Sequence, residues 1–327
     1  MDSDFWIDAI GIKDLPSWNP EDNWKQEPST SLAVPIGTWR DPSDPNYVYS
    51  RKGKSSVFLD LVKDGPHGIV LGSTGTGKSY LTKSVLFGTA ATYSPRDVQF
   101  LVLQIFGSEM AHSVSKLPHT AATFGCVEHR TDILVDIDAA LTKEMSRRHA
   151  LIQASGANSF DEHNSACYGE DRLPRIVVVV EEAEFALSAS KHKDVLAKIL
   201  TDVCRDGTAL GFHLLITGWT YNSLPEQVVR AINKGYGITL RTSDRDTSVQ
   251  AVGVPDAVCL SGGTGHALLR RHGNLESFAG YSPTNHELCE KLEANTDPVA
   301  KSLTKGLRDS LRHVPGSPFS PHFDSVS

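Results

Sequence analysis

The feature that most constrains this chain is a glycine-rich turn between an apolar run and a segment with helical character. Residues 72–79 have the sequence Gly-Ser-Thr-Gly-Thr-Gly-Lys-Ser, which matches the spacing G-x-x-x-x-G-K-S. The apolar run at 68–71 predicts a strand before the turn, and residues 78–91 predict a helix after it. This order of strand, turn and helix distinguishes a phosphate-binding loop from an ordinary glycine-rich turn.

The residue types in this loop suit phosphate chemistry. Glycines let the backbone turn tightly and point successive N–H groups at phosphate oxygens, and the following helix adds the positive end of its dipole. Lys78 would reach the β- and γ-phosphates, and the Ser79 hydroxyl would be a ligand of Mg²⁺. We therefore predict that ATP and Mg²⁺ bind here through Gly72, Ser73, Thr74, Gly75, Thr76, Gly77, Lys78, Ser79 and Tyr80.

The rest of the chain alternates between apolar runs of strand length and amphipathic segments of helical period. Strands are predicted at 98–105, 176–180, 212–217, 237–241 and 266–270, and further helices at 131–154 and 194–210. Strands that alternate with helices form a doubly wound α/β fold, with a mostly parallel sheet flanked by helices. The run at 176–180 has so many β-branched residues that we expect it in the middle of that sheet.

Two carboxylates follow this central strand and would complete the nucleotide site. Glu181 is expected to hold a magnesium-bound water, so we count it with Ser79 among the metal ligands, and Glu182 is expected to polarise the attacking water. The alternative is that both are surface glutamates that happen to follow a core strand.

Charge and composition limit the function classes. The formal net charge of −7 argues against a surface that wraps nucleic acid non-specifically, although a small basic loop is compatible with it. No apolar run is long enough to cross a membrane, and the acidic start of the chain does not resemble a secretory leader. The five scattered cysteines fit reduced thiols in a cytoplasmic protein.

The regular pattern has irregular flanks. Residues 1–50 predict an extended, turn-rich arm, which Trp18, Trp24 and Trp39 would pin to the domain. Residues 283–313 predict C-terminal helices. Their apolar stripe of Val299, Leu303, Leu307 and Leu311 is expected to pack on the chain's own domain. Residues 314–327 are rich in Pro and Ser and predict a disordered tail.

Several short motifs, in order and spacing, are similar to those of a known family. They are Val34-Pro-Ile-Gly37, Gly65-Pro-His-Gly68, Leu117-Pro-His-Thr120, Leu210-Gly-Phe-His-Leu-Leu215 and Gly253-Val-Pro-Asp-Ala257. With the loop at 72–79, they make the chain resemble the FtsK/SpoIIIE branch of P-loop motors. More narrowly, it looks like the first ATPase domain of EccC, the motor of type VII secretion. The resemblance implies a P-loop NTPase of RecA/AAA-like type at 51–282.

The resemblance also implies assembly into a ring, in which a neighbouring copy supplies an arginine to the γ-phosphate. Arg205 is the candidate for that arginine. Thr217, at the end of a predicted strand, matches a polar sensor position of the family.

The chain departs from the family pattern around the nucleotide. Glu181 stands where the family has Asp, Gly218 where it has Gln, and Trp219 where it has Arg. Gln104 and Phe106 stand where the family has Asp and Lys. Together these departures predict slow, partner-dependent or lost hydrolysis with ATP binding retained.

Three functions remain open from the sequence. The first is a motor that exports polypeptides in a type VII-like secretion system, cytoplasmic and held at the inner face of the membrane through partners. The second is a translocase of double-stranded DNA or a conjugative coupling ATPase, for which the acidic chain shows no basic DNA-reading module. The third is a non-catalytic scaffold that ATP only stabilises.

Two other features have structural interpretations. His119 lacks a second metal ligand at suitable spacing, so we expect a packed or turn-stabilising histidine. Arg147 and Arg148 lie in a predicted long helix near Glu144, where a solvated charged face is the expected role.

Overall fold

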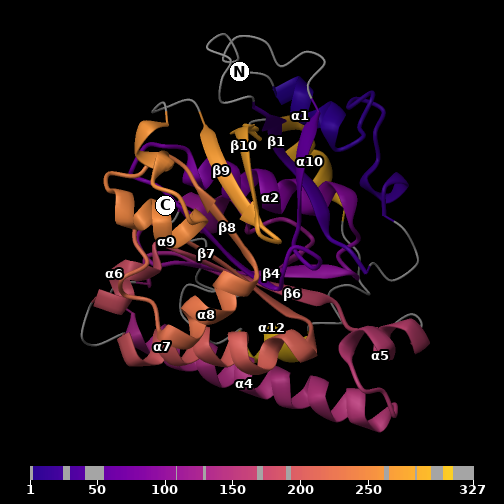
Figure 1. Ribbon diagram of the computed structural model, residues 1–327. Helices are drawn as coiled ribbons and strands as arrows, with labels where there is room; N and C mark the ends of the chain where they lie inside the picture. Colours follow the sequence, from indigo (N-terminus) through magenta and orange to yellow (C-terminus); the bar gives the residue numbers. More distant parts are fainter. Residues whose placement is uncertain are drawn as a thin grey trace.

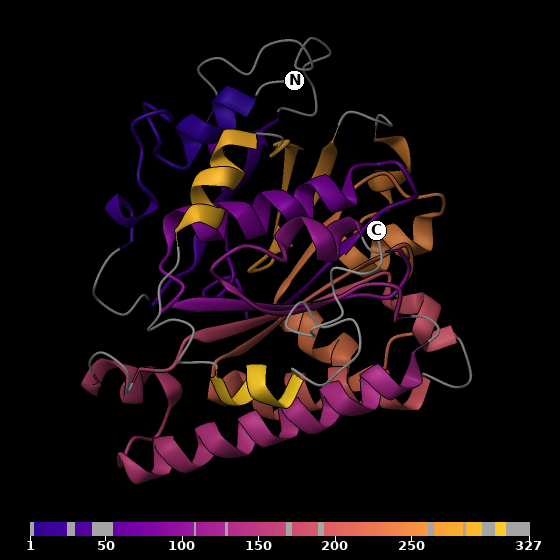
Figure 2. The same cartoon turned by 180° about the vertical axis from the view of Figure 1, so that it is seen from behind.

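The computed structural model describes residues 3–24, 30–40, 55–107, 109–127, 130–167, 172–188, 193–260, 265–283, 286–295 and 305–311. Within these residues, ten strands form one mixed sheet in the order β2-β1-β10-β9-β8-β3-β7-β6-β4-β5. Helices cover both faces of the sheet (Figures 1 and 2). The predicted α/β fold, with its mostly parallel sheet between helices, is confirmed.

The parallel part of the sheet contains most of the strands that the sequence predicted. It consists of β8 (Tyr236–Thr239), β3 (His67–Leu71), β7 (Phe212–Gly218), β6 (Arg175–Glu181), β4 (Val98–Gln104) and β5 (Thr120–Phe124). All residues of these strands are buried, as expected for apolar runs without alternation that have helices on both faces. The edge strand β5 was not predicted, because Thr-Ala-Ala-Thr-Phe is short and only partly apolar.

The antiparallel part consists of β9 (His266–Arg271), β10 (Asn274–Gly280), β1 (Ala33–Trp39) and β2 (Ser56–Asp60). The strand β1 belongs to the segment predicted as an extended arm, yet it lies inside the sheet between β2 and β10. Gly37 of β1 faces Gly280 of β10, and a Cβ on Gly37 would overlap the backbone of β10. The sequence did not reveal this pairing because the two strands lie far apart along the chain.

One face of the sheet is covered by α1 (Ser3–Ala9), α2 (Lys78–Thr92), α3 (Glu109–Val114) and α10 (His286–Ala294), as Figure 2 shows. The N-terminal segment packs on α2: Trp6 is fully buried, and the Trp24 indole N–H donates to the carbonyl of Ala90 at 3.0 Å. Trp18 is also buried, whereas Trp39 is 45% exposed. Two of the three predicted tryptophan anchors are thus confirmed, and Trp39 is not one.

The other face is covered by α4 (Thr131–Ala154), α6 (Ala183–Ser188), α7 (Lys193–Asp202), α8 (Glu226–Lys234) and α12 (Lys305–Leu311). Leu307 and Leu311 are fully buried on this face, so this half of the predicted stripe packs on its own domain; Val299 and Leu303 lie outside the described residues. No described helix is both long and apolar enough to cross a membrane.

The helix predicted at 194–210 changes its geometry before its end. α7 stops at Asp202, and a π-helical turn (Val203–Gly207) and a 3₁₀ turn (Thr208–Leu210) follow. Two further helices are α5 (Phe160–Ala166) and α9 (Arg245–Val252), whose Phe160, Ala251 and Val252 join the core under α4.

The prediction that Arg147 and Arg148 lie on a solvated face of α4 is wrong for Arg148. Arg148 is fully buried; its guanidinium donates to Glu144 at 2.9 Å and to the carbonyl of Leu210 at 3.0 Å. The role expected for His119 is confirmed: the ring is fully buried against Phe100, and its Nε2 lies 2.7 Å from the carbonyl oxygen of Tyr93.

Candidate nucleotide-binding site

The predicted site residues other than Arg205 lie at one edge of the sheet. β3, β7 and β6 are parallel neighbours, so their carboxyl ends lie side by side. The glycine-rich loop follows β3, Thr217 lies near the end of β7, and Glu181 ends β6 directly opposite Thr217. A binding site at the carboxyl ends of parallel strands is the usual place in such sheets.

The loop itself requires glycine. Gly75 and Gly77 have φ of 77° and 109°, which side chains other than glycine rarely adopt. A Cβ on Gly72 would lie 2.7 Å from the hydroxyl of Thr76. α2 begins directly after Gly77 without a side-chain cap, so its first N–H groups point into the loop with no side-chain acceptor at the cap. Unsatisfied amides at a helix start are a natural site for phosphate.

Lys78 lies across this loop. Its ammonium donates to the carbonyl oxygen of Gly72 at 2.8 Å and to that of Ser73 at 3.3 Å, and the side chain is only 9% exposed. Burial lowers the pKa of Lys78, and the neighbouring carboxylates, Glu182 first, oppose that shift. The lysine is therefore held in the loop, with only weak carbonyl ligands that an anion can replace.

The two predicted metal ligands lie near each other. The Ser79 hydroxyl is close enough to the carboxylate of Glu181, which is 3% exposed, to favour its charged form and so to oppose the rise in its pKa. Burial, reinforced by the charge of Glu182, raises the pKa of Glu181 to about 7, although Lys78, Lys83 and the Ser79 hydroxyl pull in the other direction. A buried carboxylate with so high a pKa lacks sufficient positive charge nearby.

Glu182 has an unusual backbone. Its φ of 57° lies in the left-handed region, which costs a residue with a side chain about 1–3 kcal/mol. Its N–H donates to the carbonyl oxygen of Thr217 at 2.9 Å and lies 3.4 Å from the Thr217 hydroxyl. Burial raises the pKa of Glu182 as well. Thr217 thus fixes the backbone that aims Glu182 toward the cavity described below.

A third carboxylate, which the sequence analysis missed, completes the cluster. Glu184 is 5% exposed, accepts a hydrogen bond from the backbone N–H of Trp219 at 2.9 Å, and has a pKa that burial raises. A Cβ on Gly218 would overlap its carboxylate. Glu184 therefore occupies the space that a side chain at position 218 would need. The sequence offered two clues: the acidic run Glu-Glu-Ala-Glu at 181–184, and a glycine at position 218, where the family has Gln.

The other departures from the family pattern also have local explanations. The side-chain oxygen of Gln104 accepts from two backbone N–H groups at the start of α3, at 2.9 and 3.1 Å, and so caps that helix. Phe106 is 56% exposed and stacks on Phe185, which in turn contacts Trp219 at 5.1 Å between ring centroids. Phe106 and Trp219, at two positions that are basic in the family, thus form a row of aromatic side chains with Phe185. This row lies beside Glu184.

A cavity of about 640 Å³ opens above the loop, a size suited to a small-molecule ligand. Its wall comprises residues 74–83 apart from Thr82, together with Glu109, Glu182, Leu240, Gly265, Gly280, Tyr281 and Ser282. Lys83 and Glu109 form an ion pair of 3.0 Å within this wall. The predicted phosphate-binding residues from Thr74 to Tyr80 therefore share one cavity with Glu182.

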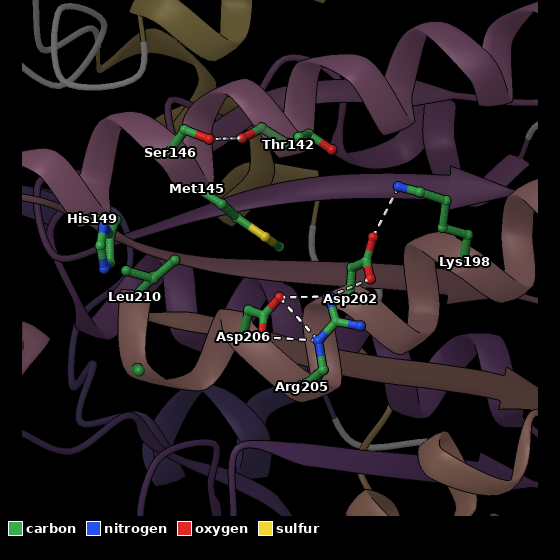
Figure 3. A pocket seen from close by; sticks show the side chains of 10 residues that line it. Thr142, Met145, Ser146, His149, Lys198, Asp202, Arg205, Asp206 and Leu210 are labelled. Atoms are coloured by element: carbon green, nitrogen blue, oxygen red, sulfur yellow. Dashed lines mark hydrogen bonds and ion pairs between the residues drawn. The ribbon is translucent and has the colours of Figure 1, made fainter.

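Arg205 is not brought to this cavity. It lies in the π-helical turn after α7, on the face of the sheet opposite α2, and lines a separate pocket beside α4 (Figure 3). There it forms exposed ion pairs with Asp202 at 2.9 Å and with Asp206 at 2.7 Å. A role for Arg205 at a γ-phosphate would need a second copy of the chain, and it remains a prediction.

The residues of this site fit magnesium and a nucleoside triphosphate. Two buried carboxylates, Glu181 and Glu184, and the half-buried Glu182 lie near the buried ammonium of Lys78. This excess of negative charge suits a divalent cation, and Ser79 and Glu181 offer the oxygen ligands that magnesium prefers. The uncapped start of α2 and the ammonium suit the phosphates that would accompany it.

Comparison with known proteins agrees with this geometry. The sequence model of the FtsK/SpoIIIE family matches residues 37–228, more than half of the chain. ESX-5 secretion system protein EccC5 of Mycobacterium tuberculosis is 29% identical over 227 residues, which are 66% of this chain and 16% of EccC5. ESX-1 secretion system protein EccCa1 of the same species is 25% identical over 272 residues, which are 77% of this chain and 34% of EccCa1. The chain thus spans only a sixth to a third of these relatives.

Solved structures share the fold. The cytoplasmic domain of the type VII secretion ATPase EccC of Thermomonospora curvata superposes with a TM-score of 0.76 at 24% identity, over 89% of this chain and 34% of that one. The conjugation coupling protein TcpA of pCW3 superposes with a TM-score of 0.61 at 19% identity, over 81% of this chain and 69% of that one.

Proposed function

The chain belongs to the FtsK/SpoIIIE family of P-loop ATPases, and from that premise we propose that it is an EccC-like motor domain. It binds ATP and couples binding, with slow or partner-stimulated hydrolysis, to the export of polypeptides in a type VII-like secretion system. The names of EccC5 and EccCa1, both ESX secretion system proteins, support the system. The observation that carries the proposal is the glycine loop that holds Lys78 at the start of α2, on the same cavity wall as Glu182.

Each group has a role in this proposal. The loop amides and Lys78 would bind the phosphates, and Ser79 and Glu181 would hold Mg²⁺, whose positive charge would stabilise the phosphate oxygens. Glu182 lines the cavity and orients the attacking water. Thr217 fixes the backbone of Glu182 through the hydrogen bond to its N–H.

The departures from the family pattern support slow hydrolysis. Glu181 starts half-protonated near neutral pH, because its pKa is about 7, and must lose that proton before it can bind a metal. Gly218 supplies no side chain, and the carboxylate of Glu184 takes its space. A carboxylate there adds negative charge beside Glu182, where the family has a neutral amide.

We also place the domain in a ring or a multimer, at the inner face of the membrane through partner proteins. Arg205 supports this part, since it is exposed and remote from its own loop. Asp202 and Asp206 would have to release it before it reached a neighbour's nucleotide.

The test is ATP turnover and ATP affinity of the purified chain, measured alone, with helical substrate peptides and with double-stranded DNA. We expect affinity in the micromolar range, slow turnover alone, and stimulation by peptide but not by DNA. Glu182→Gln should abolish turnover and retain binding, whereas Lys78→Ala should weaken binding by at least tenfold.

The outcomes separate the hypotheses. Stimulation by DNA instead of peptide would move the chain to the translocase class. Binding without turnover under every condition, with partner assembly intact in Lys78→Ala, would make it a scaffold. Absence of any nucleotide affinity in the wild-type chain would refute the motor assignment.

A further inference from the structure

A second lysine lies at the phosphate end of the cavity. Lys83 is in α2, four residues after Ser79, and its side chain is 17% exposed. Side chains at this spacing share one face of a helix and lean toward its N-terminus, so Lys83 extends toward the loop. It lines the cavity, and its charge opposes the rise in the pKa of Glu181. The ammonium of Lys83 is therefore close to where phosphates and a metal would bind.

Glu109 is paired with this ammonium. The two side chains form an ion pair of 3.0 Å, and both residues line the cavity. The pair is uneven, because the Glu109 side chain is 87% exposed. An exposed carboxylate that leaves an ion pair stays in water and loses little, whereas the mostly buried lysine needs a new partner. Glu109 is therefore the partner that an incoming anion can replace.

The backbone of Glu109 does not have to move for this exchange. Gln104 caps the start of α3, because its side-chain oxygen accepts from the N–H groups of Met110 and Ala111 at 2.9 and 3.1 Å. The Met110 side chain is buried in the core. α3 is thus held by other contacts, and a rotation of the exposed Glu109 side chain is enough to release Lys83.

The charges of the cavity wall explain why a second cation matters. Among the described residues that line the cavity, the cations are Lys78 and Lys83, and the anions are Glu109 and Glu182. Two positions that are basic in the family belong here to the row of aromatic side chains. A bound triphosphate would add several negative charges to a wall that is already balanced. Lys83 is the further cation that becomes available to them once Glu109 withdraws.

We propose that Lys83 is a second phosphate-binding cation of this site, and that Glu109 competes with the nucleotide for it. The ion pair acts as a latch, and the phosphates gain their full set of contacts only when Glu109 turns out to solvent. A phosphate inside the cavity is the stronger partner, because a partly buried charge pair is screened less than an exposed one. The inference rests on the proposed function, since it concerns the same nucleotide site.

The test is a double-mutant cycle on ligand binding. The dissociation constants of Mg-ATP and Mg-tripolyphosphate are measured by calorimetry for the wild-type chain, Lys83→Met, Glu109→Gln and the double variant. We expect Lys83→Met to weaken both ligands about tenfold, and Glu109→Gln to strengthen both about threefold. In the Lys83→Met background, Glu109→Gln should change either constant by less than about twofold, because the latch is already gone.

Matched variants separate the latch from the simple loss of a charge. Glu226→Gln removes a similarly exposed carboxylate from an ion pair on α8, away from the cavity, and should leave both constants within about twofold. Lys83→Arg keeps the positive charge and should bind both ligands within about threefold of wild type. Thermal unfolding of each variant checks the fold. Glu109→Gln changes only an exposed side chain, so it tests the latch even if Lys83→Met is unstable.

Each failure has its own signature. If the wild-type chain binds neither ligand, the motor assignment fails and the latch fails with it. If both ligands bind but Glu109→Gln does not strengthen them, or strengthens them equally in the Lys83→Met background, only the latch fails. If Lys83→Met weakens ATP but not tripolyphosphate, Lys83 contacts the nucleoside, and a loss seen only with Mg²⁺ means that it acts through Glu181. Either of these results overturns the phosphate contact.

Discussion

Glu144 on α4 and Glu181 at the end of β6 are about equally hidden from water, with exposed fractions of 1% and 3%. Their surroundings are opposite. Burial alone would raise the pKa of Glu144, but hydrogen bonds and charges from Arg147 and Arg148 outweigh it and hold the pKa below its usual value. Burial and a neighbouring carboxylate raise the pKa of Glu181 to about 7.

The difference distinguishes a structural charge from a functional one. Glu144 receives compensation within the chain, since Arg147 binds both of its oxygens at 2.7 Å and Arg148 binds one at 2.9 Å. Lys78, Lys83 and the Ser79 hydroxyl favour the charged form of Glu181 but do not offset its burial and the charge of Glu182. Buried groups with raised pKa values and too few partners mark sites where something binds.

The largest expected effect comes from breaking the compensated pair. Glu144→Ala leaves Arg148 buried without a counter-charge and should cost about 3–5 kcal/mol in the free energy of unfolding, measured with urea. Glu226→Ala is the matched control, because Glu226 and Arg230 form the same i,i+4 pair in an exposed position. It should cost less than about 0.5 kcal/mol. Similar losses in both variants would contradict the comparison.

The uncompensated carboxylate should respond in the opposite direction. Because the folded pKa of Glu181 lies above its unfolded value, the folded state loses stability as the pH rises through about 7. Glu181→Gln removes that loss and should stabilise the ligand-free chain at pH 8 by on the order of 2 kcal/mol. The same variant should lose the enhancement of ATP binding by Mg²⁺. A destabilised Glu181→Gln would show that the site is already balanced without ligand.

The pH dependence of binding sharpens the same point. Magnesium requires the ionised form of Glu181, so the ratio of ATP affinity with Mg²⁺ to that without should rise about tenfold between pH 6 and pH 8. Glu181→Gln controls for the titration of the nucleotide itself and should show a smaller rise. Parallel curves for wild type and variant would remove Glu181 from the metal site.

The smallest effect tests how Glu184 and Gly218 fit together. Gly218→Ala places a methyl group against the Glu184 carboxylate and should cost about 1 kcal/mol. In the Glu184→Ala background the same change should cost nothing, because the space is then free. The cycle is measured by thermal unfolding of the four proteins. If the two costs simply add, the methyl group at position 218 and the Glu184 side chain do not compete for space.

The sequence predicted the local parts of the site well. The spacing of 72–79 and the apolar run before Glu181 are encoded within a few neighbouring residues, and α4 (Thr131–Ala154) has the bounds that its period predicted. Tertiary contacts were harder to predict. Arg148 looked exposed by its type, and only the buried carboxylate and carbonyl around it explain its place in the core.

Glu184 shows the same limit within the site. Nothing in the neighbouring sequence distinguishes Glu184, the third acid of an acidic run, from a surface residue. Its burial depends on the space left by Gly218 at the end of β7, far away in the sequence. The far wall of the cavity likewise assembles from Leu240, Gly265 and Gly280, which are brought together only by the sheet.

The position of β1 has a consequence for synthesis. The hairpin of β1 and β2 leaves the ribosome early, but β10, the second neighbour of β1, is made only after the whole parallel core. Until then β1 presents one row of backbone amides and carbonyls without their final partner, and such open rows pair readily with other nascent chains. The domain closes late, when Gly280 reaches Gly37. A nascent chain stalled before that point should be recognisable by its need for a chaperone.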